Sequence, residues 1–333
     1  MIGIGIVGCG KIAEIRHIPE YATNENCRIV GLYDSNRDRA EALVAQFGGR
    51  VFESLESLLA CKEIDAISVC TSNDTHAQIT IQAMRAGKHV LCEKPMAMNV
   101  AEAEAMVKAA QETDRQLMIG QNQRLAPAHQ LAKKLLTSGK LGEILSFQAT
   151  FAHGGPESWL KEKTTKSIWF FDKKKLPAGV LADLGIHKID LICWLLEDEV
   201  VEVKAILGTR DKTGPDGQLV PVPDTAALIV RFRNGAIGTI YCGWTAYGAE
   251  DNSTVLYCKN GILQIYRDGA QLRWIHPGGS VETFAPGEIQ TNERQSRSGI
   301  IDLFVHGILE GQNAIPGEDG LRAMRIMYEA LER

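Results

Sequence analysis

The chain lacks the cysteine patterns that mark a metal-binding or disulfide-stapled protein. Its eight cysteines include no C-x-x-C pair and no His-Cys ligand spacing, and most of them lie inside apolar runs. Thiols in this setting are typical of reduced, buried cysteines, so we expect a cytoplasmic protein without a structural metal.

Long apolar runs and a charged leader are also missing. No apolar stretch reaches the roughly 18 residues that a membrane span requires. The strand-like segment IGIGIV follows Met1 at once. We therefore expect neither a signal peptide nor a membrane anchor.

The sequence has no excess of basic charge. Thirty-six Lys and Arg residues stand against 41 Asp and Glu, which gives a net charge of -5. The short basic runs at 161–163 and 173–175 are mixed with acids and aromatics, and we interpret them as solvated loop charge. This balance provides no electrostatic field to hold nucleic acid.

The length and the order of patterns predict two domains. A chain of 333 residues with 45% hydrophobic content exceeds the usual size of one core. Within residues 1–121, β-rich runs alternate with helical patterns, which predicts a doubly wound parallel sheet, a Rossmann domain. The expected strands are 2–7, 28–34, 66–72, 89–95 and 116–120, and the expected helices start at residue 11 or span 37–48, 76–87 and 101–112.

The pattern changes in residues 122–333. A helix at 126–139 and a strand at 143–152 precede a long loop, the helical run ADLGIHKIDLICWLL and several strands. The turn signals Asn234-Gly235, Asn260-Gly261 and Asp268-Gly269 predict hairpins. We expect an α+β domain with a large open, mostly antiparallel sheet and helices on one face. The C-terminal helix, about 317–333, is able to pack back on the first domain.

A glycine motif joins the first strand to the first helix. Gly8, Gly10 and Ala13 form G-x-G-x-x-A, in which the glycines permit a tight turn and the approach of a diphosphate to the main chain. Asp34 ends the next strand, where a carboxylate can bind both adenosine ribose hydroxyls. The alternative is an ordinary glycine turn, but position, strand and acid together favour a dinucleotide.

Two further motifs carry reactive side chains. Glu93, Lys94 and Pro95 stand at the carboxyl end of a strand, the edge at which such sheets bind ligands. Asp183, His187 and Asp190 fall within about 60° on a helix at 100° per residue, as one polar stripe. Taken alone, E-K-P is typical of a surface turn. The spacing of Asp183 and His187, taken alone, is typical of a local hydrogen-bonded pair.

In order and spacing, these motifs resemble the glucose-fructose oxidoreductase, inositol dehydrogenase and rhizopine catabolism family (Gfo/Idh/MocA). The resemblance covers essentially the whole chain and includes GIVGCGKIAEIRHIPEY, HVLCEKPMA, SGKLGEILSFQATF and GVLADLGIHKIDLICWLL. It implies that the nicotinamide lies between E-K-P and the D-x-x-x-H helix. The catalytic residues would then be Lys94, Asp183 and His187, although some relatives carry Tyr in place of this His.

The resemblance and the chemistry together suggest a role for each residue. His187 would be the general base, since histidine is the side chain best matched to proton transfer at neutral pH; Lys94 would polarise the substrate oxygen and Asp183 would orient it. Asp190 would support them. The opposite helix face, with Leu184, Leu191 and Leu195, would pack into the core.

Other positions are expected to contact cofactor or substrate. Substrate candidates besides the catalytic three are Asn122, Arg124, His153 and Trp169, with Trp159 as a further aromatic; the alternatives are a hinge for the first two and local packing for the aromatics. Asp224 is expected to be structural. The cofactor-binding set is Gly8, Gly10, Lys11, Ile12, Ala13, Asp34, Ser35, Arg39, Thr71, Ser72, Asn73, His76, Glu93, Lys94 and Gln123.

The sequence thus predicts an NAD-dependent oxidoreductase that acts on a secondary alcohol of a sugar, cyclitol or sugar derivative. Two alternatives stay open, an NAD-retaining glycosidase of the same family and a non-catalytic dinucleotide-binding sensor. Asp34 should disfavour NADP, although Arg37, in the loop after it, could pair with a phosphate. The resemblance also implies a homodimer or homotetramer formed through the open sheet.

Overall fold

The computed structural model describes the chain except for residues 160–168, 291–294, 296 and 333. The chain divides into two compact units. The first contains Met1–Asn122 and Gln290–Met324, and the second contains Gln123–Ile289 and Arg325–Arg333. The basic run at 161–163 and the side chain of Trp159 lie outside the described part, so their expected roles stay predictions.

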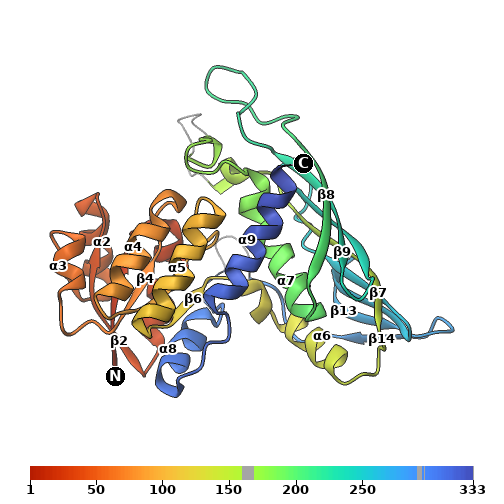
Figure 1. The fold of residues 1–333 in the computed structure, drawn as a ribbon, viewed down its shortest axis with the longest axis horizontal. Coiled ribbons are helices and arrows are strands. Elements are labelled where there is room, and N and C mark those ends of the chain that lie inside the picture. The colour runs from red at the N-terminus through yellow and green to blue at the C-terminus, as the bar shows by residue number, and fades with distance from the viewer. Residues whose placement is uncertain (160–168, 291–294, 296, 333) are drawn as a thin grey trace. The chain divides into compact units, whose positions relative to one another are not determined.

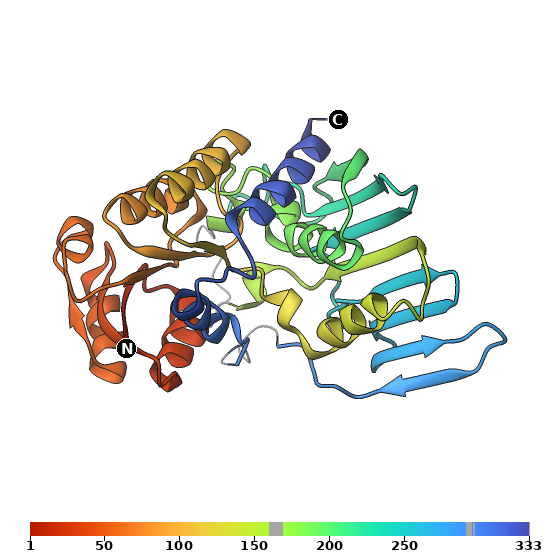
Figure 2. The ribbon, with the colours of Figure 1, turned by 60° about the horizontal axis from the view of Figure 1, so that its bottom comes forward.

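The first unit is built on a six-stranded sheet. Its strands are β1 (Ile2–Val7), β2 (Cys27–Tyr33), β3 (Arg50–Val51), β4 (Ala66–Val69), β5 (His89–Cys92) and β6 (Leu117–Ile119). They are all parallel and run in the order β3-β2-β1-β4-β5-β6, which is the order of a dinucleotide-binding fold. Figure 2 shows helices on both sides of this sheet, so the predicted Rossmann fold is confirmed.

The helices of this unit follow the apolar periodicity of the sequence. They are η1 (Ala13–His17), α1 (Ile18–Thr23), α2 (Arg37–Phe47), α3 (Leu55–Leu59), α4 (Asn73–Arg85), α5 (Val100–Thr113) and α8 (Ile300–Glu310). Asparagine caps begin two of them, since Asn36 accepts a hydrogen bond from the main chain of α2 and Asn99 from that of α5. The sequence patterns did not predict β3 and α3, because two and five residues are too short to show a period.

The C-terminal helix α9 (Gly317–Leu331) begins against the first sheet. A Cβ at Gly317 would lie 2.8 Å from a methyl of Leu117, and one at Gly320 would lie 2.8 Å from Ile119 and Met96. Glycine at these two positions therefore lets the helix lie close to β6.

The second unit is built on eight strands. They are β7 (Ile144–Ala152), β8 (Val200–Gly208), β9 (Thr225–Phe232), β10 (Ile237–Gly243), β11 (Thr254–Cys258), β12 (Gly261–Arg267), β13 (Ala270–Ile275) and β14 (Val281–Phe284). The order is β14-β13-β12-β11-β7-β10-β9-β8, and only β7 and β10 pair in parallel. The prediction of a mostly antiparallel sheet is confirmed.

The three expected turns join neighbouring strands of this sheet. Gly235 has φ 93° between β9 and β10, and Gly261 has φ 131° where β12 begins. Asp268 and Gly269 both have positive φ, 50° and 74°, as a tight two-residue hairpin requires. Asparagine, aspartate and glycine tolerate these conformations, which is why the signals were readable.

One face of the second sheet is covered and the other is open (Figure 1). Along β9, buried and exposed residues alternate. The helices α6 (Pro127–Thr137) and α7 (Ile186–Leu196) pack on the buried face. On the open face, Ile206, Ile229 and Ile237 are exposed, the first by 82%. An apolar face of this kind is unusual for the surface of a monomer.

All eight cysteine thiols are free, and seven of them are buried. This agrees with the sequence reading of inert thiols rather than disulfides. Within the described residues, no helix combines the length and the apolar character that crossing a bilayer demands.

Candidate active site

The first glycine of the motif, Gly8, is required by the packing of the protein itself. Gly8 follows β1 with φ 91°, and a Cβ there would lie 2.7 Å from the main chain of Cys70 and Thr71. Both the conformation and the close approach exclude a larger residue. The loop therefore packs tightly against the end of β4.

The second glycine has free space where a side chain would stand. A Cβ at Gly10 would find nothing within 4 Å, so no packing requirement of the described chain explains glycine here. Free space beside the start of a helix, with main-chain N–H groups nearby, fits an approaching diphosphate. Lys11 is exposed, Ile12 is half-buried, and Ala13 is fully buried where the helix approaches the sheet.

Asp34 lies directly after β2 and faces the same loop. Its carboxylate accepts the N–H of Cys9 at 2.6 Å and that of Asn36 at 2.7 Å. These two bonds hold the acid beside the glycine loop, where a ribose would follow a bound diphosphate. Ser35 and Arg39 are exposed nearby.

The structure places Arg37 in the helix expected at 37–48 and not in the loop after Asp34. This residue begins α2 after the Asn36 cap. Its guanidinium contacts Glu41 and Glu53, each at 2.6 Å. A first-turn arginine with two carboxylate partners is less available to a phosphate than one in a loop.

The segment after β4 lies at the same edge of the sheet. Thr71 and Ser72 are half-buried, and Asn73 begins α4. The ring of His76 is 1% exposed, and its two nitrogens face the carbonyl oxygens of Pro95 and Thr71, at 2.9 and 3.1 Å. His76 thus joins this segment to the E-K-P turn.

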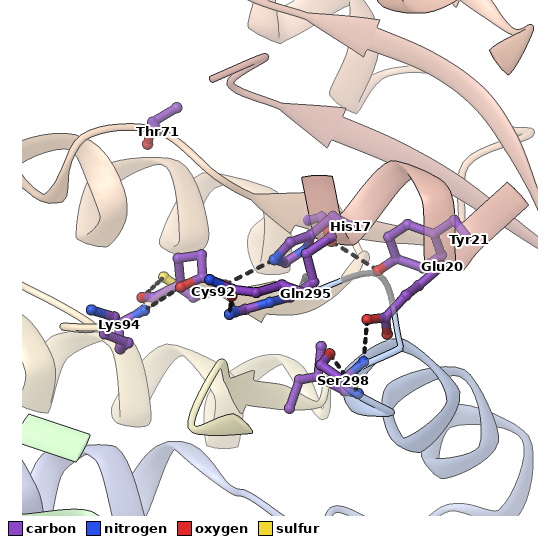
Figure 3. Close-up of polar contacts among 12 residues, drawn as sticks. His17, Glu20, Tyr21, Thr71, Cys92, Lys94, Gln295 and Ser298 are labelled. Carbon is purple, nitrogen blue, oxygen red and sulfur yellow. Dashed lines mark hydrogen bonds and ion pairs between the residues drawn. The ribbon is translucent and has the colours of Figure 1, made fainter. Parts of the chain in front are cut away.

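The E-K-P turn follows β5 directly, and its glutamate is buried. Glu93 Oε1 accepts hydrogen bonds from His17 Nε2 at 2.9 Å and from Arg16 at 3.1 Å (Figure 3). Glu93 Oε2 faces the main-chain N–H of Lys94 at 3.3 Å. Burial alone would raise the pKa of this carboxyl, but the His17 hydrogen bond and the Arg16 charge outweigh burial and leave the pKa well below its usual range.

Ser68, His17 and Glu93 resemble a hydrolytic triad in composition. Ser68 Oγ lies 3.0 Å from His17 Nδ1, and its other neighbour is the hydroxyl of Tyr21 at 2.8 Å. Ser68 is fully buried inside β4, so no substrate reaches its oxygen. The arrangement is a support for Glu93 and not a nucleophile site.

In the second unit, the D-x-x-x-H segment is not one regular helix. Leu181–Gly185 forms a π-helical turn, η5, and the α-helical part α7 begins only at Ile186. The stripe calculated at 100° per residue therefore does not hold across Asp183. Single π-helical turns are frequent at functional sites.

The residues around this turn are buried and aromatic. Asp183 accepts a hydrogen bond from Trp244 Nε1 at 3.1 Å. The ring of Phe151 lies 6.0 Å from both His187 and His153, and His153 Nδ1 faces the N–H of Gly155 at 3.0 Å. The rings of two predicted site residues, His153 and His187, thus both lie near Phe151 within this unit. Leu184, Leu191 and Leu195 are buried as expected.

The segment after β6 holds the other predicted contacts. Arg124 binds the carboxylate of Asp190 through two nitrogens. Gln123 donates to Asn252 at 3.2 Å, and Asn122 is half-buried in the short helix η2 (Asn122–Leu125). The guanidinium of Arg124 and the amide nitrogen of Gln123 therefore bind protein partners of the second unit.

The aromatic loop and the PDTAA segment differ in what they contact. Trp169 is half-buried and lies against Phe170, with ring centroids 4.0 Å apart. The carboxylate of Asp224 accepts the main-chain N–H groups of Arg210, Asp211 and Lys212 at 2.8 to 3.0 Å. Asp224 thus fixes a loop, in agreement with the structural role expected for it.

Two buried polar groups were missed. The Arg16–His17 pair gave no signal beyond its place after the glycine motif. Lys188 is fully buried and donates to Asn252 O and Thr254 Oγ1 at 3.0 and 3.2 Å, whereas lysine in a sequence normally indicates a surface. The described residues contain no group of three or more His, Cys, Asp or Glu placed to hold a metal ion.

Comparison with known proteins agrees with this fold. Residues 2–121 match the oxidoreductase family with an NAD-binding Rossmann fold, and residues 129–264 match the Gfo/Idh/MocA C-terminal domain. A levoglucosan dehydrogenase solved in complex with NADH superimposes with a TM-score of 0.89 at 25% identity, covering 99% of this chain and 96% of that chain.

Two curated relatives are similar in sequence. Glucose-6-phosphate 3-dehydrogenase of Bacillus subtilis is 36% identical over 69% of this chain, and the match spans 64% of its own length. UDP-N-acetylglucosamine 3-dehydrogenase of Acidithiobacillus ferrooxidans is 33% identical over 98% of this chain and 95% of its own length. The chain therefore belongs to the Gfo/Idh/MocA family of oxidoreductases, as its E-K-P and D-x-x-x-H motifs indicated.

Proposed function

We propose that the protein is an NAD-dependent oxidoreductase acting on a secondary alcohol of a sugar, cyclitol or sugar derivative. One observation carries the proposal. The open glycine loop follows β1, Thr71 follows β4 and Lys94 follows β5, so all three stand at the carboxyl edge of one parallel sheet. This is the edge at which doubly wound sheets bind dinucleotides.

The chemistry divides among the predicted residues. A bound nicotinamide supplies the hydride acceptor for alcohol oxidation. His187 takes the hydroxyl proton as general base, the Lys94 ammonium stabilises charge on the substrate oxygen, and Asp183 orients the substrate by a hydrogen bond. Residues 1–121 form the cofactor domain in this proposal, and residues 122–333 form the substrate and oligomerisation domain.

Several finer statements belong to the same proposal. NAD is preferred over NADP because Asp34 is held beside the glycine loop by two main-chain N–H groups. The substrate is a small carbohydrate or polyol, and the protein works in a reducing, cytoplasmic compartment. A second copy of this chain covers the open face around Ile206 and Ile229, giving a homodimer or homotetramer.

A spectrophotometric screen of sugars, sugar phosphates and polyols with NAD and NADP tests the proposal. We expect NADH to accumulate with at least one compound. Release of an aglycone from glycosides without net NADH would instead favour the redox-neutral glycosidase. Tight NADH binding without turnover of any compound would favour the sensor.

A further inference from the structure

The E-K-P turn is held on both sides of Lys94 by buried histidines. His17 bonds to Glu93, the residue before the lysine, and His76 bonds to the carbonyl of Pro95, the residue after it. Both rings are almost completely excluded from solvent. The proposed reaction uses neither ring, so their role requires another explanation.

The hydrogen bonds around His17 form a chain in which each group donates to the next, from Tyr21 to Glu93. A Glu93 carboxylate only accepts, so His17 Nε2 carries the proton on that side. The Nδ1 of a neutral ring then accepts from the Ser68 hydroxyl, whose oxygen in turn accepts from Tyr21 (Figure 3). Every group in this chain then has a partner, so these bonds fix the orientation of the ring.

The chain ends on the main chain of Lys94. Oε1 of Glu93 is bound by His17 and Arg16, and its Oε2 faces the Lys94 N–H. A Cβ at Gly120 would lie 3.0 Å from Glu93 Oε1, so the residue that follows β6 also encloses the carboxylate. The position of this side chain is therefore determined from several directions.

The supporting residues come from the turn that follows the glycine loop. Arg16 and His17 end η1, whose first residue is Ala13 of the G-x-G-x-x-A motif. The segment expected to bind the diphosphate is thus linked through Glu93 to Lys94. Buried partners that orient a reacting side chain commonly change activity by roughly 10- to 100-fold when they are lost.

We propose that His17 is a positioning residue that acts through Glu93 to fix Lys94 relative to the glycine loop. The inference rests on the proposed role of Lys94. Through this link, the lysine amine stays in place as substrate and cofactor bind. Displacements of about 1 Å are enough to lower turnover by about 100-fold.

Two substitutions of His17 test the roles of its two ring nitrogens separately. The amide of His17→Gln reaches the place of Nε2 and can still donate to Glu93, whereas the amide of His17→Asn reaches only the place of Nδ1. With the most active compound of the sugar and polyol screen, we expect His17→Asn to lower kcat by roughly 10- to 100-fold and His17→Gln by only a few-fold. The Kd of NADH, measured by fluorescence, should change by less than about threefold in both, since main-chain groups hold a diphosphate.

His89 offers a matched control. It lies at the opposite end of β5 and accepts the N–H of Gln116 at 3.1 Å, so the same changes there disturb a partly buried hydrogen bond far along the strand from Lys94. His89→Asn and His89→Gln should keep wild-type kcat. Thermal unfolding of all variants shows which of them fold.

Three results would overturn the inference. The first is a wild-type kcat in His17→Asn, and the second is an equal loss of kcat in both His17 variants. The third is a raised Kd of NADH with unchanged kcat, which would show that the network serves binding of the diphosphate. If His17→Asn does not fold, Glu93→Gln replaces it, and wild-type kcat there overturns the inference equally. Lys94→Ala is measured in parallel. Full activity of Lys94→Ala would refute the proposed function. If Lys94→Ala is inactive and both His17 variants are fully active, only this inference is refuted.

Discussion

Arg124 binds Asp190 in a buried two-point ion pair within the second unit. The guanidinium Nε and Nη2 lie 2.7 and 2.5 Å from the two carboxylate oxygens, and both residues are 2% exposed. Asp190 stands three residues after His187 on α7. The pair therefore joins the helix of the proposed base to the segment that begins the second unit.

Loss of either partner should destabilise the protein. Arg124→Lys cannot reproduce the two-point contact, and Asp190→Asn leaves a buried cation without its counter-charge. We expect Asp190→Asn to lower the free energy of unfolding by about 3–5 kcal/mol and Arg124→Lys, which keeps the positive charge, to lower it by less, both measured in denaturant. Arg231→Lys is the control, because its pair with Glu202 is exposed and should contribute at most about 1 kcal/mol. A raised KM with unchanged stability in Arg124→Lys would instead support the substrate contact expected from the sequence.

Removal of the proposed reacting groups should abolish most turnover. We expect His187→Ala and Lys94→Ala each to lower kcat by roughly two to four orders of magnitude, the range for losing a general base or an electrostatic stabiliser. Binding of NADH to His187→Ala should change little. His306→Ala, on the exposed face of α8, is the control. Near wild-type kcat in either variant would show that the role given to that residue is wrong.

Cofactor choice should depend on Asp34. A carboxylate about 4 Å from the 2′-phosphate of NADP repels each unit of its charge by about 4 kcal/mol at an effective dielectric constant near 20, and by less where solvent screens the pair. We therefore expect kcat/KM to favour NAD by roughly tenfold or more, and Asp34→Ser to narrow the gap. Asp38→Ser, in the exposed first turn of α2, should leave the ratio unchanged. Equal kcat/KM values in the wild-type protein would mean that a nearby arginine compensates the acid.

The buried Lys188 should make stability depend on alkaline pH. Burial lowers its pKa from 10.5 to about 7, against the opposing charges of Asp251 and Glu250. Between these two pH values the unfolded lysine holds a proton that the folded one has lost. The unfolding free energy should therefore rise with pH through this window, by up to about 1.4 kcal/mol per pH unit.

Lys188→Met isolates this contribution. The thiols and phenols ionise in the same window once the chain is unfolded, so the quantity to compare is the difference in unfolding free energy between wild type and variant. This difference should increase in favour of the wild type from pH 7 to pH 10. Lys204→Met, at an exposed position of β8, should show no such trend. A flat difference for Lys188→Met would mean that the amine is charged in the folded protein throughout.

The sequence by itself determined most of the elements and predicted the glycine loop of the proposed site. Alternation of strand and helix patterns fixed the parallel sheet, because parallel strands need long crossovers. Gly8, Gly10 and Asp34 were readable because the tight turn and the approach of a diphosphate each demand particular residue types at fixed spacing. The hairpins were readable because positive φ is confined to few residues.

Only the tertiary structure decided which polar side chains bind one another. Arg124 and Asp190 are 66 residues apart, and His17 and Glu93 are 76 apart, so no local period connects them. The π-helical turn at Asp183 was equally hidden, because its sequence differs little from that of an α-helix. The burial of Lys188 could not be predicted for a related reason. A charged side chain is buried only where acceptors are available, and its acceptors, Asn252 and Thr254, come from a distant strand and the loop before it.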